Sequence, residues 1–430
     1  MENIEGLSES VETTINRVNS AVFSQNELKE KKKDEDLKLW PAAGLSLSRK
    51  GVVVKGTKHL LKELLKGVLR GGCIGFALKA SLNLVFALVK RKGASGIVKE
   101  IFCEDVYSFV RFLSAYLGLF RFTNAYLAQK SGKDTDRNAA TAGFVASLAI
   151  LLDQTERRKG IALFCLVRAL DVKVKSMVRL GQLPYISFFE SFMFGITNIP
   201  IAYGFLYEPE ILDKGYYKWI LNMGNVPEEG IQKTFREPMY ARERGEFLPF
   251  QPCCPHYHEG TCVHHITTDF FHCLGRAGKI YLPVHILPLL LFRYKSLMND
   301  TVGTLSHTGK AFISSCVFLS SYVQIMKSTV CFNRNRLKRD ERWFGVVAGL
   351  LTSFATYFER SSRVSELMLY CLPRSLTAAW IFLERRNMVS MVPFYEVPMF
   401  AVAMSILMSC KRGDFKPAYH RQLAWLIGNK

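Results

Sequence analysis

The sequence predicts an all-α, multi-pass membrane protein built from two tandem four-helix repeats, each with an additional amphipathic helix at the membrane interface. Three observations predict this fold class. An internal repeat relates the two halves of the chain, uncharged apolar runs recur in both halves, and basic residues flank those runs. A chain of 430 residues is also long enough for two units of this size.

The internal repeat extends without gaps at an offset of 206 residues. Residues 67–196 and 273–402 share 27 identities over 130 positions. Matched Arg, Glu, Cys and Gly residues are not a product of hydrophobic bias, so the repeat indicates a tandem duplication. The matches include FFESFMF at 188–194 with FYEVPMF at 394–400, LFCLVRAL at 163–170 with LYCLPRSL at 369–376, Arg70 with Arg276, and Gly72 with Gly278.

This duplication predicts five successive parts of the chain. We expect a disordered polar N-terminal tail, a first membrane repeat, a linker rich in Cys and His, a second membrane repeat and a C-terminal anchoring tail. Their boundaries are 1–45, 46–222, 223–272, 273–410 and 411–430. The tail at 1–45 contains no apolar core of the length that a secretory signal peptide needs.

Each predicted repeat contains four short apolar runs. Most uncharged runs are 13 to 17 residues long, below the usual length of a span, but they reach about 20 residues if a flanking Lys or Arg snorkels. The predicted spans are 67–89, 106–127, 139–153 and 187–207, then 273–294, 311–331, 343–358 and 391–410. Buried helices of a soluble α-helical bundle are the alternative. Four spans per repeat would make the repeats parallel, whereas five would invert them.

Two further features recur around the third predicted span. Basic amphipathic stretches at 157–181 and 363–386 follow it, and they are typical of helices that lie in the membrane interface. Small residues spaced by four within it allow helices to approach closely. They are Gly345, Gly349 and Ser353 in the second repeat, and Ala139, Gly143 and Ser147 in the first.

A glutamate stands in apolar surroundings at the start of the fourth predicted span in both repeats, at Glu190 and Glu396. Because a charge at membrane depth is costly, it is rarely left facing lipid. We therefore predict ion pairs of Glu190 with Arg168 or Arg179, and of Glu396 with Arg374 or Arg385. The alternative places both carboxylates, solvated and unpaired, among the lipid headgroups.

A Cys/His-rich segment precedes the second repeat. CCPHYHEGTCVHHITTDFFHC at 253–273 holds four of the eleven cysteines and five of the nine histidines. Tetrahedral Zn²⁺ takes four N or S ligands. The candidate ligands are Cys253, Cys254, His256, Cys262 and His264, with His258 as an alternative to His256 and His265 to His264. No C-x2-C pair is present, so a reduced linker without metal is the other interpretation.

Several function classes lack their motifs. The sequence contains no P-loop, dinucleotide fingerprint, paired-carboxylate site or HExxH, and we expect no enzyme. The net charge of +20 is spread over short basic blocks that alternate with apolar runs. This pattern favours an anionic lipid surface over nucleic acid as the partner.

LRGGCIG at 69–75, AGF at 142–144 and LVRAL at 166–170 resemble the peroxisomal membrane protein 4 type of the Tim17/Tim22/Tim23 superfamily. The duplicated form with a preceding Cys/His segment resembles the transmembrane protein 135 family, or peroxisomal membrane protein 52 type. The residues that carry this second resemblance are Cys253, Cys254, His256, Tyr257, Cys262, Cys331, Ala348, Gly349 and the Cys371–Arg374 stretch.

The resemblance to this family implies a multi-pass protein of the peroxisomal membrane, and also of the mitochondrial membrane. It implies a transporter, scaffold or regulator in lipid or cholesterol handling and mitochondrial dynamics. The expected partners are the lipid bilayer, a lipid or sterol cargo, and organelle-dynamics or translocase proteins. A Tim17-type protein-translocation pore or accessory subunit is one alternative, and a soluble α-helical interaction protein is the other.

Overall fold

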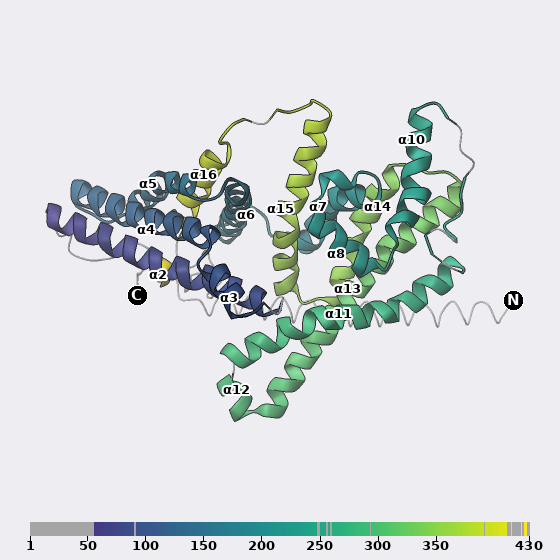
Figure 1. The fold of residues 1–430 in the computed structure, drawn as a ribbon, viewed down its shortest axis with the longest axis horizontal. Coiled ribbons are helices and arrows are strands. Elements are labelled where there is room, and N and C mark those ends of the chain that lie inside the picture. The colour runs from purple at the N-terminus through teal and green to yellow at the C-terminus, as the bar shows by residue number, and fades with distance from the viewer. Residues whose placement is uncertain are drawn as a thin grey trace. The chain divides into compact units, whose positions relative to one another are not determined.

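The computed structural model describes residues 56–89, 92–246, 250–254, 257–258, 260–292, 294–390, 392–410, 414, 423 and 425–427. Every regular element in these ranges is helical, which confirms the predicted all-α class (Figure 1). Across the same ranges, no helix combines the length and the apolar character of a membrane span.

Helices α2 to α7 cover the first sequence repeat. α4 is capped by Gly132 in the left-handed region, and Thr135 accepts a hydrogen bond from the amide of Asn138 to begin α5. At Ser147 the α5 helix tightens into the 3₁₀ helix η1. The elements are α2 (Thr57–Val89), α3 (Ala94–Ile101), α4 (Glu104–Ser131), α5 (Asp136–Ala146), η1 (Ser147–Leu152), α6 (Thr155–Arg179) and α7 (Phe189–Leu206).

The second repeat contains the same succession of long helix, long helix, α-to-3₁₀ helix, amphipathic helix and short apolar helix. Its elements are α11 (Cys262–Phe292), α12 (Tyr294–Asn299), α13 (Thr301–Leu337), α14 (Trp343–Leu351), η4 (Thr352–Phe358), α15 (Ser361–Arg385) and α16 (Glu396–Ser409). Helices α2 and α11 both begin before the predicted first spans. The 58–68 stretch therefore belongs to α2, and 262–272 is helical rather than an extended linker.

The offset of 206 residues is preserved in the backbone. Helices α6 and α15 begin and end at equivalent positions. After them, Gly181 and Asn387 adopt positive φ angles of 72° and 54°. Phe188 and Phe394, which precede the fourth helices, do the same at 66° and 59°. Residues 112–196 and 318–402 therefore have the same order of helices.

Short helical elements connect α7 to the Cys/His segment. They are η2 (Pro209–Ile211), α8 (Lys214–Gly224), α9 (Glu228–Ile231), a π-helical turn η3 (Gln232–Arg236) and α10 (Glu237–Glu243). Asp213 caps α8 by accepting from the amide of Tyr216, and Pro238 occupies an early position of α10, where no intrahelical donor is needed.

The chain forms two compact units that differ from the two sequence repeats. Unit 1 comprises residues 1–154, 172–180 and 404–430, and unit 2 comprises 155–171 and 181–403. In unit 1, α2 and α4 approach so closely at Gly67 and Gly71 that an added Cβ would collide with α4 backbone atoms. Because these glycines lack a side chain, the two long helices can pack backbone against backbone.

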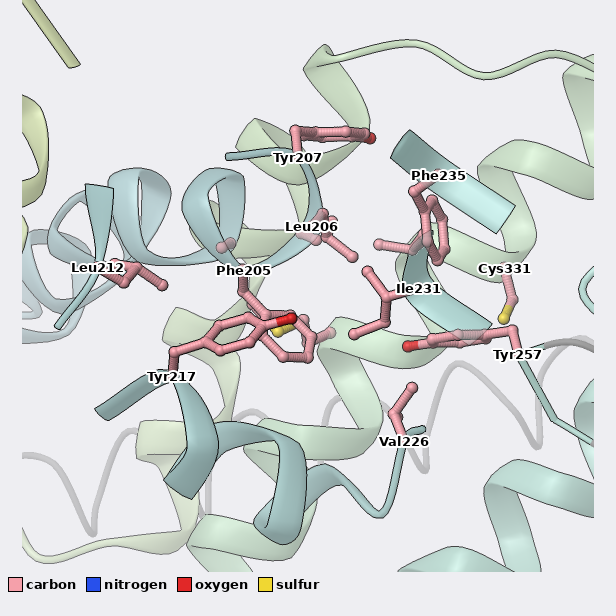
Figure 2. Close-up of a cluster of buried hydrophobic side chains, with 14 of the residues drawn as sticks. Phe205, Leu206, Tyr207, Leu212, Tyr217, Val226, Ile231, Phe235, Tyr257 and Cys331 are labelled. Atoms are coloured by element: carbon pink, nitrogen blue, oxygen red, sulfur yellow. The ribbon is translucent and has the colours of Figure 1, made fainter. Parts of the chain in front are cut away.

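Unit 2 has an apolar core in which α7 packs on α14 and α15. Figure 2 shows a cluster of buried side chains, with Leu206 and Ile231 near its centre, Tyr207 at the top, and Tyr257 and Cys331 at one edge. The ridge predicted from sequence lies at the crossing of α7 and α14. A Cβ at Gly345 would lie 3.3 Å from Tyr203 Cα. In unit 1, the buried Ser147 donates a hydrogen bond of 2.7 Å to the Gly143 carbonyl.

Within the described residues of unit 2, the predicted ion pairs of Glu190 with Arg168, and of Glu396 with Arg374 or Arg385, do not form. The alternative pair of Glu190 with Arg179 stays a prediction, because these two residues belong to different units. The four arginines have other contacts: Arg168 with Glu366 at 2.8 Å, Arg179 with Asp414, Arg385 with Glu210 at 3.2 Å, and Arg374 with the Tyr370 carbonyl at 3.0 Å and the Tyr216 ring at 5.1 Å.

A helix terminus accounts for the repeated acid better than an arginine does. Glu190 and Glu396 both lie in the first turn of their helices, α7 and α16. The unpaired amide groups of a helix N-terminus carry partial positive charge, which favours a carboxylate there. The N-terminal amides of α7 and α16, rather than arginines of α6 and α15, therefore account for the two glutamates.

Candidate metal centre

Four side chains from three segments of unit 2 converge at the edge of the Figure 2 cluster. Cys253, His258, Cys262 and Cys331 place their ligand atoms within 4.8 Å of one another. Cys253 and His258 come from the segment before α11, Cys262 is the first residue of α11, and Cys331 lies near the end of α13. Cys253 and Cys331 are buried, as is His258.

A tight turn brings the first two of these residues together. The amides of Tyr257 and His258 both donate to the Cys253 carbonyl, at 2.7 and 3.3 Å. The chain therefore reverses between Cys253 and His258 before α11 begins. Tyr257 is itself buried, and its ring lies edge-on to Phe235 at 5.2 Å, which attaches the turn to the apolar core.

The separations fit a tetrahedral metal ion. Zn–S and Zn–N bonds of about 2.3 and 2.0 Å imply ligand–ligand distances of about 3.5–3.8 Å. His258 Nε2 lies 3.3 Å from Cys262 Sγ and 3.8 Å from Cys331 Sγ. Three sulfurs and one imidazole nitrogen form a full Cys₃His set, so the ligands present can close the coordination shell without a substrate position.

Two side chains donate hydrogen bonds to the sulfurs. Arg334 Nη1 lies 3.2 Å from Cys253 Sγ, and Asn335 Nδ2 lies 3.2 Å from Cys262 Sγ. Donors to metal-bound thiolates orient them and offset their charge. Neither residue is recognisable as part of the site from the sequence, because both lie among basic residues that follow an apolar run, a pattern typical of a membrane flank.

Arg334 is fully buried and links several segments. Its guanidinium donates to the carbonyls of Thr234 and Gln251, both at 3.0 Å, and pairs with Asp340. The rings of Phe235 and Phe250 flank it at 4.8 and 5.1 Å. A buried arginine with all of these partners holds the sulfur side of the cluster in place.

The electrostatic environment favours a thiolate at Cys253. A hydrogen bond from the Cys331 thiol is the largest cause, and it outweighs desolvation to hold the pKa of Cys253 well below its usual range. His258 and Arg334 act in the same direction. The hydrogen bond between the two cysteines, together with burial, raises the pKa of Cys331. A thiolate is the form of cysteine that binds metal ions.

A buried polar network adjoins the cluster. The His265 ring stacks on His258 with a centroid distance of 4.6 Å, and its Nε2 lies 3.4 Å from Lys327 Nζ. Lys327 in turn forms an ion pair of 2.7 Å with Asp269. Burial opposes ionisation of Asp269, but hydrogen bonds from Lys327 and Arg276 outweigh it and lower the pKa of its carboxyl.

The sequence prediction of this centre was correct in part. Cys253 and Cys262 are in the cluster, and His258 is the histidine that joins them. His256 lies outside the described residues. Cys254 and His264 do not belong to the group, and the His264 side chain points to solvent. Cys331 was missed as a ligand because it is remote in sequence. The available signal was that the first repeat has Ala125 at the equivalent position.

One feature of the histidine departs from common metal sites. His258 Nδ1 is buried and has no hydrogen-bond partner among the described residues, from which 255–256 and 259 are excluded. A ligating imidazole usually donates its second N–H to an acceptor. The sulfurs of Cys253 and Cys262 thus have hydrogen-bond donors that orient them, whereas the described residues provide no acceptor for His258 Nδ1.

No protein-family model matches this chain, and no solved structure matches it.

Proposed function

We propose that Cys253, His258, Cys262 and Cys331 bind a structural Zn²⁺ ion. The observation that carries this proposal is the convergence of four soft ligands, mostly buried, from segments that are distant in sequence. Bound zinc would connect the segment before α11 to the end of α13 and so stabilise the folded chain. A full set of protein ligands supports a structural role, because catalytic zinc keeps one position open.

Metal analysis of the purified full-length protein tests the site. We expect about one zinc per chain by mass spectrometry, consistent with one four-ligand set. Cys331→Ser should abolish stoichiometric zinc, whereas Cys316→Ser should retain it. Cys316 is a matched control, because it is a buried cysteine of the same helix outside the ligand group. Zinc-free wild-type protein that folds, or equal zinc in both variants, would contradict the proposal.

At the level of the whole chain, we propose an organelle-membrane protein of the transmembrane protein 135 type with no enzymatic reaction. It would act in peroxisomal and mitochondrial membrane homeostasis, through lipid or sterol handling, as transporter, scaffold or regulator. Exposed large side chains on α5 and η1 of the first repeat, and on η4 of the second, support lipid contact. They include Phe144, Leu148, Phe354 and Tyr357, with Phe354 and Tyr357 exposed by 67% and 86%.

Membrane insertion and location need separate tests. After alkaline carbonate extraction of cells that express the tagged full chain, we expect the protein in the membrane pellet. Release into the supernatant would favour the soluble α-helical alternative. Imaging against peroxisomal and mitochondrial markers tests the location, and proximity labelling tests the function. Enrichment of translocase subunits instead of lipid-handling proteins would favour the Tim17-type translocation role.

A further inference from the structure

Each compact unit is completed by residues from the other sequence repeat. Unit 1 holds much of the first repeat but also residues from Met404 onward. Unit 2 holds most of the second repeat but also residues 155–171 of α6, as well as α7 and α8, from the first repeat. We call residues 198–224, and the described residues 404–410, 414, 423 and 425–427, the two closing segments. They occupy equivalent positions, because the offset of 206 residues relates Asn198 to Met404.

Each unit contains a close helix crossing at a glycine in which the second helix comes from the other sequence repeat. A Cβ on Gly143 would lie 2.9 Å from the Met404 carbonyl oxygen, and a Cβ on Gly349 would lie 2.7 Å from that of Asn198. Gly143 and Gly349 are equivalent, as are Met404 and Asn198. In each crossing, the glycine of one repeat therefore receives the closing segment of the other.

A repeated acid–base pair gives a second, independent observation. In unit 1, Glu63 binds Arg121 at 2.7 Å, and in unit 2, Asp269 binds Lys327 at 2.7 Å. These pairs are again related by 206 residues. Their charges are preserved, although their side chains differ, and all four residues are largely buried.

Arginines of this region donate hydrogen bonds to backbone carbonyls of the closing segments. Arg70 Nε donates to the Leu426 carbonyl at 3.1 Å, and Arg121 Nη1 to that of Ile427 at 2.7 Å. Arg276 Nε, equivalent to Arg70, donates to the carbonyl of Met223 at the end of α8 at 3.1 Å. Met223 lies in the last turn of α8, whose carbonyls lack intrahelical donors and carry partial negative charge, so a cation stabilises them.

We infer that each repeat carries a docking site for the closing segment of its sibling repeat. The site has two parts. One is a glycine at the crossing of the fourth helix, and the other is an acid–cation pair with an arginine that donates to backbone carbonyls of the closing segment. The two repeats are thus related as the subunits of a helix-exchanged dimer on one chain. This inference is independent of zinc, since all four metal ligands belong to unit 2.

A nicked full-length protein tests which repeat holds the second closing segment. A protease site placed at 387–393 cuts the exposed connection between α15 and α16 after purification. We expect the fragment that contains residues 404–427 to remain bound and the complex to have the mass of one chain. A complex with the mass of two chains would overturn in-chain docking.

Equivalent substitutions then identify the acceptor. If the segments are exchanged, Gly143→Ala should speed release of this fragment about tenfold, because the added Cβ opposes Met404. Gly349→Ala should leave the release rate unchanged. If each repeat instead holds its own segment, the two effects are reversed, and that result would overturn the inference. Gly160→Ala is a neutral control, since open space surrounds that position.

A charge variant keeps the test decisive if the glycine variant folds poorly. Arg121→Gln removes the cap on the Ile427 carbonyl and should speed release several-fold. Lys327→Gln, at the equivalent position of the second repeat, should not. Equal release rates for the two variants would contradict docking by this pair.

Discussion

Replacing Gly349 with alanine should destabilise unit 2, whereas the same change at Gly275 should stabilise it. Both glycines lie inside helices of this unit. A Cβ at Gly349 would lie 2.7 Å from two backbone atoms, Asn198 O and Ile199 Cα, whereas a Cβ at Gly275 would have nothing within 4 Å. The two variants therefore share a chemical change and differ in the space available for it.

The magnitude follows from the crossing of α7 and α14. Ordinary contact begins at 3.4 Å, so the backbones must separate by about 0.7 Å. Overpacking of this kind costs about 1–3 kcal/mol. Alanine in a helix interior is favoured over glycine by about 0.5–1 kcal/mol, and both variants receive this gain. The difference between the two variants therefore isolates the packing cost, about 1–3 kcal/mol.

Thermal unfolding of the purified full-length protein measures this difference. For a unit of this size, about 1 kcal/mol corresponds to about 2–4 °C. Gly349→Ala should therefore melt about 2–12 °C below Gly275→Ala. Equal melting temperatures, or a lower value for Gly275→Ala, would show that α7 does not cross α14 at this glycine.

Three further outcomes follow from the contacts of charged side chains. Arg334→Lys should weaken zinc binding about 10- to 100-fold in chelator competition, because lysine cannot reproduce the hydrogen-bond set around Cys253; unchanged affinity would remove its role. Desolvation tends to raise the pKa of Glu63, but Arg121 and Lys66 outweigh it and lower the pKa to about 2, from 4.5. Its stabilisation is complete above pH 4.5 and is lost as the pH falls to about 2. We expect a loss of about 1–2 kcal/mol over that window, which Glu63→Gln should not show. Glu190→Gln and Arg168→Gln should have additive effects on stability, since the two side chains are not paired; coupling in a double-mutant cycle would contradict this.

The order and type of the helices were predictable because they depend on local patterns. Apolar runs, the basic amphipathic stretches and the repeat itself placed α4 to α7 and α14 to α16 within a few residues of their observed positions. Helix α13 begins well before its predicted span, and the short helices α3, α9, α10 and α12 were not predicted. The boundaries at α2 and α11 were harder, because polar residues continue the helix beyond the apolar run. For α11, the predicted linker at 262–272 carries a helical backbone whose Asp269 is buried by distant partners.

Long-range pairing could not be predicted from a single sequence. Cys331 completes the metal group only because α13 returns to the segment before α11. The pairs Glu63–Arg121 and Asp269–Lys327 do not appear as identities between the repeats, because only the charge, and not the residue type, is the same at these positions. The repeated glutamates are the reverse case. Their residue type is the same in both repeats because both begin a helix, and not because both form an ion pair.

The exchanged closing segments have a consequence for biosynthesis. More than 250 residues separate α5 from Met404, which packs against it in unit 1. At translation rates of about 5–20 residues per second, the surface of α5 that packs against Met404 stays uncovered for about 10–50 s. Unit 1 therefore cannot finish folding as it emerges from the ribosome, although its first helices are made early. Chaperones or the insertion machinery would have to shield this surface of α5 during the interval. Nonsense mutations upstream of residue 404 should likewise destabilise unit 1, although most of it is made first.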